Sequence, residues 1–187
     1  PQENGPEIGF CGRSNAGKST VLNTLTGQKK LARVSKRPGR TQMINFFEVP
    51  KTSGCLVDLP GYGFAQVPQS LREEWGRNLA KFLAERQALL ALVLVMDVRH
   101  PMTTLDQKLL TFADHQRMET LILLAKCDKL SRNQIAQSQM KVQNQRPDST
   151  VIAFSSINKT GVSEASQWIV NRLIEPLAKN KNDEKPR

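Results

Sequence analysis

Near the start of the chain lies Gly12-Arg13-Ser14-Asn15-Ala16-Gly17-Lys18-Ser19, which matches the pattern GxxxxGK[ST] at every specified position. An apolar run, Glu7–Cys11, precedes it and a helical stretch, Thr20–Thr26, follows it. In such a unit the two glycines let the backbone curl, so that successive N–H groups and the helix N-terminus face one anion. The pattern therefore predicts a phosphate-binding loop, in which Lys18 reaches the β- and γ-phosphates of a nucleoside triphosphate and Ser19 ligates Mg²⁺.

Outward from this loop, short apolar runs alternate with amphipathic segments, as in strand–helix units around a mostly parallel sheet. The expected strands are Glu7–Cys11, Met43–Val49, Cys55–Asp58, Leu90–Asp97, Thr120–Ala125 and Val151–Phe154. The further expected helices are Ser70–Arg86, a segment opened by Thr103 and Asp106, and Val162–Leu177. Leu92–Met96 and Leu121–Leu124 are apolar on both faces, which suits strands covered from both sides. The sequence thus predicts an α/β fold, a three-layer sandwich with a six-stranded, mostly parallel sheet.

Length and composition indicate one ordinary globular domain. The chain has 187 residues, of which 39% are hydrophobic, and a chain of this size buries about 70% of the surface that it exposes when unfolded. We expect one nucleotide-binding domain over residues 1–178 and a polar tail over residues 179–187. The longest apolar run, Leu89–Val98, is half the length of a membrane-spanning helix. These features predict a cytoplasmic monomer without a membrane partner, and the first residue, Pro1, leads us to expect that a short leader is missing.

Few residues suit metal or nucleophilic chemistry of their own. Cys11, Cys55 and Cys127 lie in or beside apolar runs without CxxC spacing, and His100 and His115 are 15 positions apart. This inventory excludes a disulfide framework, a zinc site and a His-based nucleophile. We expect the cysteines to be buried as small hydrophobic residues and the histidines to lie at the surface.

Three later segments bear on which nucleotide is bound, and each follows an expected strand. The DxxG segment, Asp58-Leu59-Pro60-Gly61, offers a carboxylate for Mg²⁺ and a Gly61 N–H for the γ-phosphate. The KxD segment, Ala125-Lys126-Cys127-Asp128, offers a paired acceptor for the N1–H and N2–H₂ donors of guanine, which adenine lacks. In Phe154-Ser155-Ser156 a backbone N–H is expected to donate to guanine O6. Each segment alone also fits an ordinary polar strand end, but together they predict GTP rather than ATP.

Further segments make the sequence resemble a known family. These segments are Pro38-Gly39-Arg40-Thr41-Gln42, Asp58-Leu59-Pro60-Gly61-Tyr62-Gly63 and Asp97-Val98-Arg99-His100-Pro101. With them, and with the phosphate loop and Lys126–Asp128, the chain resembles the EngB/YihA family of bacterial GTPases, which is part of the TrmE-Era-EngA-EngB-septin-like class. The resemblance covers nearly the whole chain. It implies a Ras-like P-loop GTPase that hydrolyses GTP slowly, assists assembly of the large ribosomal subunit and is needed for normal cell division.

The resemblance also implies roles for individual residues. Thr41 is expected to ligate Mg²⁺ only when the γ-phosphate is present, although a polar residue opening a strand fits the same position. The implied catalytic residues are Lys18, Thr41 and Asn15, and the implied metal ligands are Ser19, Thr41 and Asp58. The residues expected to contact the nucleotide are Gly12, Arg13, Ser14, Asn15, Ala16, Gly17, Lys18, Ser19, Thr20, Pro38, Gly39, Arg40, Thr41, Asp58, Leu59, Pro60, Gly61, Ala125, Lys126, Cys127, Asp128, Phe154, Ser155 and Ser156.

Two positions depart from the usual GTPase pattern. Tyr62 stands where Ras-like enzymes have the glutamine that orients the attacking water. In related GTPases without that glutamine, K⁺ held partly by a phosphate-loop asparagine supplies positive charge, and Asn15 occupies that position. We therefore expect hydrolysis that K⁺ accelerates, while the alternative is that Asn15 only suits the backbone of the loop. Ala125 replaces the Thr or Asn that ties the base-reading loop to the phosphate loop, so we expect moderate nucleotide affinity.

The charge distribution indicates a polyanionic partner. The net charge is +10. Six cations fall within 12 residues that contain no acid: Lys29, Lys30, Arg33, Lys36, Arg37 and Arg40. We expect this segment to contact ribosomal RNA phosphates in the large subunit or its precursor, and the alternative is a solvated loop that serves the nucleotide's own phosphates. Two other functions stay open, an RNA-binding assembly factor whose nucleotide is mainly structural and a P-loop ATPase or kinase.

Overall fold

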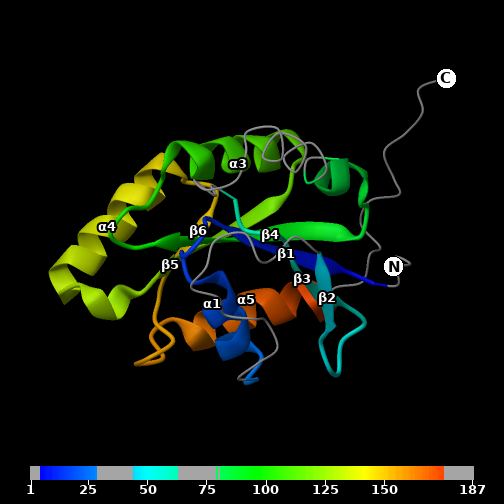
Figure 1. Cartoon of the computed structure of the whole chain (residues 1–187), viewed down its shortest axis with the longest axis horizontal. Coiled ribbons are helices and arrows are strands. Elements are labelled where there is room, and N and C mark those ends of the chain that lie inside the picture. Colours follow the sequence, from blue (N-terminus) through cyan, green and yellow to red (C-terminus); the bar gives the residue numbers. More distant parts are fainter. Residues whose placement is uncertain (1–4, 29–43, 63–78, 80, 175–187) are drawn as a thin grey trace.

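A six-stranded sheet forms the centre of the molecule (Figure 1). The computed structural model describes residues 5–28, 44–62, 79 and 81–174. The strands run in the order β2-β3-β1-β4-β5-β6, with β2 antiparallel to β3 and all other neighbours parallel. Their bounds are β1 (Glu7–Gly12), β2 (Asn45–Glu48), β3 (Cys55–Asp58), β4 (Leu89–Asp97), β5 (Glu119–Ala125) and β6 (Thr150–Phe154). The prediction of a mostly parallel six-stranded sheet is confirmed.

Helices cover both faces of the sheet, which confirms the predicted three layers. One face carries α1 (Lys18–Leu25) and α5 (Val162–Ile174), and the other carries α3 (Thr104–His115) and α4 (Arg132–Gln145) (Figure 1). On the first face Leu22 and Ile169 pack with Phe10 of β1. On the second face Leu110 and Val142 pack against the other side of the strands. Because both faces are covered, β4 and β5 read as continuous apolar runs.

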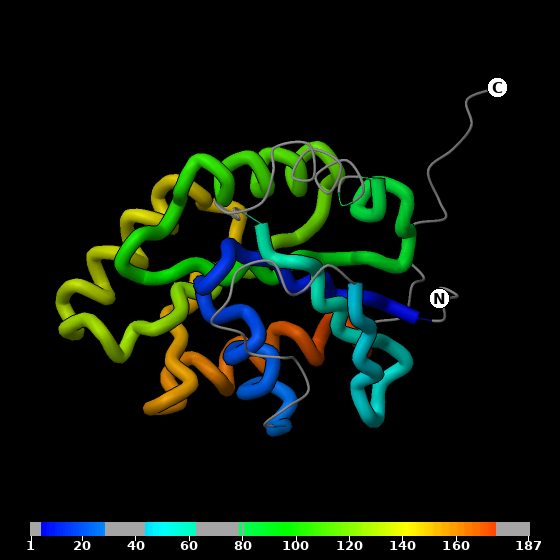
Figure 2. Tube along the Cα trace, in the orientation of Figure 1, coloured from blue at the N-terminus to red at the C-terminus, as the bar shows by residue number. Residues whose placement is uncertain are grey.

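The parallel strands end at one edge of the sheet, and this edge positions the site. Asp97, Ala125 and Phe154 pair side by side at the ends of β4, β5 and β6, while Gly12 and Asp58 end β1 and β3. Figure 2 shows the trace turning from β1 directly into α1 at this edge. Because the strand order reverses at β1, which lies between β3 and β4, the edge has the topological switch point where open α/β sheets bind ligands.

The strand predictions agree with the structure within one or two residues. β3 agrees at both ends, and β4, β5 and β6 each begin one residue earlier than predicted. β2 is shorter than the predicted Met43–Val49, of which residue 43 lies outside the described residues. These small differences arise at strand ends, where pairing rather than side-chain pattern sets the boundary.

The helix predictions are less complete. α1 begins two residues before the predicted Thr20, and α3 opens with the predicted box, in which the Thr103 N–H donates to Asp106 over 2.9 Å. Of the predicted Ser70–Arg86, residues 79 and 81–85 are helical, and residues 70–78 and 80 lie outside the described part. α5 is described to Ile174, and the predicted end at Leu177 lies beyond that part.

α4 was not predicted, because its sequence lacks an apolar stripe. Half of its 14 residues are Gln or Asn, and Val142 is its single fully buried residue. The available signal was its start, where the Ser131 hydroxyl accepts from the Gln134 N–H over 3.4 Å and the Gln134 side chain accepts from the Ser131 N–H over 3.0 Å. This capping box is a helix start signal in the sequence alone.

The cysteines and histidines take the places that their surroundings predict, with one exception. Cys11 and Cys127 are buried, whereas Cys55 is half-buried, where burial raises the pKa of its thiol to about 11. All three thiols are free. His100 and His115 are exposed. Among the described residues, no helix combines the length and the apolar character that crossing a membrane requires.

Candidate nucleotide-binding site

The loop between β1 and α1 has the turns that a phosphate-binding loop needs. Gly17 (φ +109°) and Asn15 (φ +65°) adopt left-handed conformations, which cost glycine nothing and asparagine little. Gly12 is needed for another reason, since a Cβ there would lie 2.6 Å from the carbonyl oxygen of Val95 on β4. α1 begins directly after Gly17, so its first backbone N–H groups have no intrahelical acceptor and are available to an anion.

Lys18, the first residue of α1, forms a buried ion pair with Asp58 at the end of β3. Its Nζ donates to Oδ1 of Asp58, and both residues are more than nine-tenths buried. Burial raises the pKa of Asp58 above its ordinary value, while the charge of Lys18 opposes that rise. The predicted phosphate-reaching amine and the predicted metal carboxylate therefore share one location.

The DxxG segment lies against the phosphate loop. The Tyr62 N–H donates to the Gly12 carbonyl over 3.2 Å, and the Ser14 N–H donates to the Tyr62 carbonyl over 2.9 Å. The Tyr62 ring is buried, and its hydroxyl donates to Oδ1 of Asp106 over 2.6 Å. These bonds hold the backbone of Gly61 beside the loop, while the side chain after it turns toward α3.

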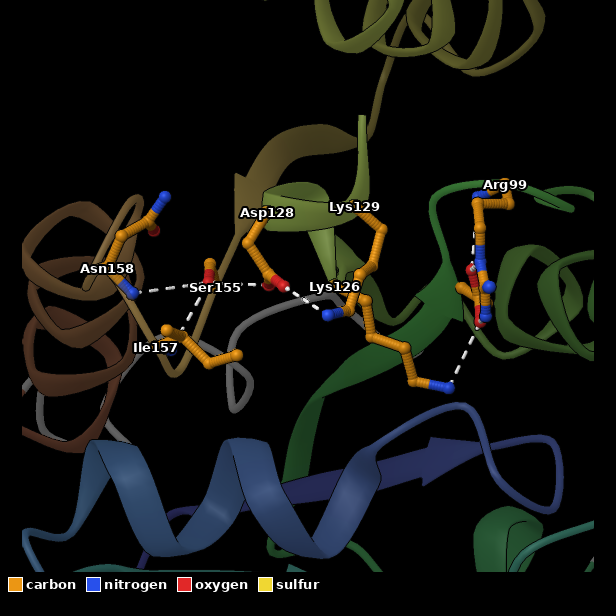
Figure 3. A network of polar contacts seen from close by, with 8 residues as sticks. Arg99, Lys126, Asp128, Lys129, Ser155, Ile157 and Asn158 are labelled. Atoms are coloured by element: carbon orange, nitrogen blue, oxygen red, sulfur yellow. Dashed lines mark hydrogen bonds and ion pairs between the residues drawn. The ribbon is translucent and has the colours of Figure 1, made fainter. Parts of the chain in front are cut away.

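Lys126 ties the base-reading segment to the phosphate loop. Its Nζ donates to the Asn15 carbonyl over 2.6 Å and to Oδ2 of Asp97 over 3.0 Å. Figure 3 shows the Lys126 side chain extending toward Arg99 and away from Asp128. The methyl group of Ala125 lies 3.8 Å from the position that a Cβ on Gly17 would occupy. The base-reading segment and the phosphate loop are thus joined through Lys126, while Ala125 has no side-chain donor or acceptor with which to join them.

Asp128, in η1 (Cys127–Lys129), is oriented by Ser155 at the end of β6 (Figure 3). The Ser155 hydroxyl donates to Oδ1 over 2.8 Å, and Nζ of Lys129 lies 3.5 Å from Oδ2. The hydrogen bond from Ser155 is the main cause that holds the pKa of Asp128 below its ordinary value. The carboxylate is therefore ionised at neutral pH, as a paired acceptor must be.

In the segment Phe154-Ser155-Ser156, from which a backbone N–H is expected to donate to guanine O6, Ser155 is already hydrogen-bonded within the protein. Its N–H donates to the Thr160 carbonyl over 3.0 Å, and its hydroxyl oxygen accepts from the N–H groups of Ile157 and Asn158 over 3.2 and 3.4 Å. The Ser155 N–H is thus engaged and not available to guanine O6. The Ser156 N–H has no hydrogen bond to any other described residue and is the remaining candidate donor.

Several predicted contact positions can offer only their backbone to a ligand. The side chains of Leu59, Cys127 and Phe154 are buried in the core. By contrast Arg13 and Thr20 are exposed at the loop. At some predicted contact positions the side chain is therefore exposed to a ligand at this edge of the sheet, and at others only the backbone is available to it.

Comparison with known proteins identifies the family. Residues 7–126 match the model of a family described as 50S ribosome-binding GTPase. The probable GTP-binding protein EngB of Aeromonas salmonicida is 47% identical over 173 residues, which cover 90% of this chain and 79% of that protein. Its counterpart from Pasteurella multocida is 48% identical over 183 residues, covering 94% and 89%. The chain belongs to the EngB family of GTP-binding proteins.

Solved structures share the fold of this EngB-family chain. A crystal structure of a probable GTP-binding protein EngB matches with a TM-score of 0.74 at 23% identity, covering 89% of this chain and 98% of the other. Era in complex with MgGDPNP and a segment of 16S ribosomal RNA matches with a TM-score of 0.73 at 18% identity, covering 98% and 60%. The predicted P-loop GTPase fold is confirmed.

Part of the predicted EngB-type site lies outside the described residues. This applies to Pro38, Gly39, Arg40 and Thr41, to the basic segment over residues 29–40, and to residues 63–78, which follow the DxxG segment. The roles of these residues stay predictions.

The donors near the loop fit Mg²⁺. The Ser19 hydroxyl lies in the first turn of α1, and the Asp58 carboxylate lies at the end of β3 against Lys18. Both are hard oxygen donors, and Mg²⁺ is usually held by one or two such groups together with waters and substrate phosphates. The donor set therefore suits a nucleotide-bound Mg²⁺.

Sequence reasoning missed the side-chain contacts of three residues at this edge. It assigned no role at the site to Asp97 or Arg99, although both stand in one of the segments that carry the resemblance. It read Asp106 only as a helix cap, whereas this carboxylate also accepts from Tyr62. No pattern in the sequence shows the bonds from Lys126 to Asp97 and from Tyr62 to Asp106, because they join residues 29 and 44 positions apart.

Proposed function

We propose that this chain binds GTP and GDP and hydrolyses GTP slowly, as a switch that assists assembly of the large ribosomal subunit. The observation that carries the proposal is the bond from Lys126 to the carbonyl of Asn15, which brings the guanine-reading segment to the phosphate loop. One nucleotide can then contact both segments. A role in normal cell division and a cytoplasmic location belong to the same proposal, on the strength of the family resemblance.

The phosphates are held by the backbone and by one amine. The first N–H groups of α1 and the turn at Gly17 face the phosphates, and Lys18 exchanges its bond to Asp58 for the β- and γ-phosphates. Ser19 and Asp58 hold Mg²⁺, which when bound neutralises phosphate charge. The Gly61 N–H, fixed beside the loop by its neighbour Tyr62, donates to the γ-phosphate.

The base is read by an ionised carboxylate. Asp128 accepts from the N1–H and N2–H₂ groups of guanine, and Ser155 holds it in place. The Lys126 stem lies along the base plane. Adenine lacks the paired donor, so the site favours GTP over ATP.

Hydrolysis is slow because the side chain after Gly61 is not available to orient water. The Tyr62 hydroxyl is buried on Asp106, away from the phosphate loop. Positive charge from K⁺, held partly by the Asn15 side chain, compensates in part. This predicts a faster rate in potassium salts than in sodium salts, with and without ribosomes.

The partner is a ribosomal particle. The family model that matches residues 7–126 is described as ribosome-binding, and the chain carries a net charge of +10, which favours RNA phosphates as contacts. The basic segment over residues 29–40 is the candidate contact, and its binding weakens as salt concentration rises.

Nucleotide competition tests the first half of the proposal. Unlabelled GTP and GDP are expected to displace a fluorescent GDP analogue from the wild-type chain, whereas ATP is not. Asp128→Asn is expected to shift the preference toward xanthine nucleotides, whose edge presents an acceptor where guanine has a donor. Equal displacement by ATP and GTP would instead favour a P-loop ATPase or kinase.

Co-sedimentation tests the second half. The chain is mixed with purified ribosomal subunits in GTP, GDP and nucleotide-free buffers, and we expect it to pellet with the large subunit in GTP. Growth complementation by Lys18→Ala is then compared with that by a variant that binds GTP but hydrolyses it poorly. Full complementation by the hydrolysis-poor variant would favour an RNA-binding assembly factor whose nucleotide is mainly structural.

A further inference from the structure

Asp97 stands at the end of β4, between the phosphate loop and the base-reading segment, and the proposed function gives it no role. Its carboxylate accepts one hydrogen bond from Lys126, on Oδ2 over 3.0 Å. The same ammonium group donates to the Asn15 carbonyl over 2.6 Å. Lys126 is therefore held between a carboxylate from β4 and a backbone oxygen of the phosphate loop.

Arg99 fixes the carboxylate of Asp97 in one orientation (Figure 3). Its backbone N–H and its Nε donate to Oδ1 over 3.1 and 2.9 Å, and its Nη2 donates to Oδ2 over 2.6 Å. These three bonds leave Oδ2 directed toward Lys126. The Arg99 hydrogen bonds are the main cause that holds the pKa of Asp97 well below its ordinary value, so the group is charged at neutral pH.

Lys126 needs an external anchor because its backbone is strained. It has φ +63° and ψ +32°, a left-handed conformation that is unfavourable for a residue with a long side chain. It is also the N-cap of η1, which carries Asp128. Any loosening of Lys126 therefore moves the carboxylate that reads the base.

Ala125 cannot supply that anchor. Its side chain is a methyl group without a hydrogen-bond donor or acceptor, and it packs beside Gly17. In this chain the strained turn is therefore held by the two hydrogen bonds that Lys126 donates, to Asp97 and to the Asn15 carbonyl. The bond to Asp97 is the one that a substitution can remove while the phosphate loop keeps its sequence.

We propose that Asp97 is a positioning residue for guanine-nucleotide binding, which acts by holding Lys126 and through it Asp128. The inference rests on the proposed function, because it assumes that the site binds guanine nucleotides. Asp97 does not contact the nucleotide. It sets the affinity by fixing the strained turn from which the base is read.

The test is the dissociation constant for a fluorescent GDP analogue. Asp97→Ala is expected to weaken binding about tenfold, the effect of losing a hydrogen bond to a charged group, and Asp97→Asn, which keeps the shape and one acceptor, is expected to weaken it less. The matched control is Asp114→Ala, which breaks another two-bonded arginine–carboxylate pair, with Arg146 between α3 and α4. That control is expected to leave the affinity unchanged.

A double-mutant cycle with Lys126→Ala separates positioning from a merely structural role. If Asp97 acts through Lys126, Asp97→Ala added to Lys126→Ala weakens binding by less than about twofold. An undiminished effect in the Lys126→Ala background overturns the proposal, and so does equal GDP affinity of Asp97→Ala, Asp97→Asn and Asp114→Ala. Failure of the wild-type chain to bind GDP would instead overturn the proposed function, so the two failures are distinguishable.

Discussion

The hydroxyl of Tyr62 donates a hydrogen bond to Oδ1 of Asp106 over 2.6 Å, and both residues are buried. The other carboxylate oxygen of Asp106 accepts from the backbone N–H and the hydroxyl of Thr103, the N-cap residue of α3. The residue after the DxxG glycine is therefore anchored to the start of a helix on the sheet face opposite α1. Burial is the main cause that raises the pKa of Tyr62 far above its ordinary value, so the hydroxyl keeps its proton and stays a donor.

Tyr62→Phe is expected to destabilise the protein and to leave the GTP hydrolysis rate unchanged. The substitution removes one hydrogen bond to a buried carboxylate, which costs about 1–3 kcal/mol of unfolding free energy. Urea unfolding measures this loss, and Thr24→Val, which removes an exposed helix hydrogen bond, is the control with a small effect. A large drop in the hydrolysis rate without loss of stability would contradict the assigned orientation of Tyr62.

The buried pair of Lys18 and Asp58 predicts a strong coupling in the nucleotide-free protein. Lys18→Ala leaves the Asp58 carboxylate buried and unpaired, so we expect a loss of about 3–5 kcal/mol in unfolding free energy. Adding Asp58→Asn is expected to restore part of that loss. Urea unfolding of both single variants and the double variant measures the coupling, and additive losses would contradict it.

The same pair has a pH signature. The pKa of Asp58 in the folded protein is raised above its ordinary value of 3.8, and removal of the Lys18 charge raises it further. Because the pKa of Asp58 is raised in the folded protein, this group stabilises the fold when it is protonated, and that stabilisation is lost as pH rises. The effect is larger in Lys18→Ala, so the difference in unfolding free energy between the wild type and Lys18→Ala is expected to shrink on acidification. Lys81→Ala, which breaks an exposed pair with Glu85, serves as the control that changes little.

The sequence was informative wherever a local pattern carries the structure. The alternating apolar runs gave five of the six strands to within one residue at each end, and the loop at Gly12–Ser19 lies where the strand–loop–helix pattern placed it. α4 was missed because its stability comes from one buried valine, a capping box and contacts such as the bond from Ser138 to the Val98 carbonyl. Such contacts depend on the sheet already being formed, so no window of sequence contains them.

For the candidate site, too, the sequence located residues that stand in local motifs but did not show the contacts between distant segments. The sequence located Asp128 and Lys18, because each stands in a short motif after a strand. It did not show that Ser155 uses its hydroxyl on Asp128 or that Lys126 makes the bond expected at position 125, because these contacts depend on how the loops approach each other. Motifs thus specify which groups are present, and the packing of the loops specifies which group holds which.

Ser155→Ala is expected to weaken GDP binding and to make it more sensitive to acid. The Ser155 hydrogen bond lowers the pKa of Asp128 below its ordinary value of 3.8. Without it that pKa rises, so the carboxylate begins to lose its charge at a higher pH as the solution is acidified. The ratio of GDP dissociation constants at pH 7 and at about pH 4.5 measures the change. Ser149→Ala, whose hydroxyl bonds to Thr120 away from the site, is the control, and an unchanged ratio in Ser155→Ala would contradict the assignment.

Asn15→Gly separates the two roles considered for Asn15, since glycine adopts φ +65° without cost and keeps the carbonyl that accepts from Lys126. If the side chain holds K⁺, Asn15→Gly retains GDP affinity and loses the stimulation of hydrolysis by potassium over sodium. Lys51→Gly, at another exposed left-handed position (φ +67°), controls for the added backbone freedom. Stimulation that persists in Asn15→Gly would mean that Asn15 serves only the backbone of the loop, because the variant adopts the same left-handed conformation but has no side-chain amide to hold K⁺.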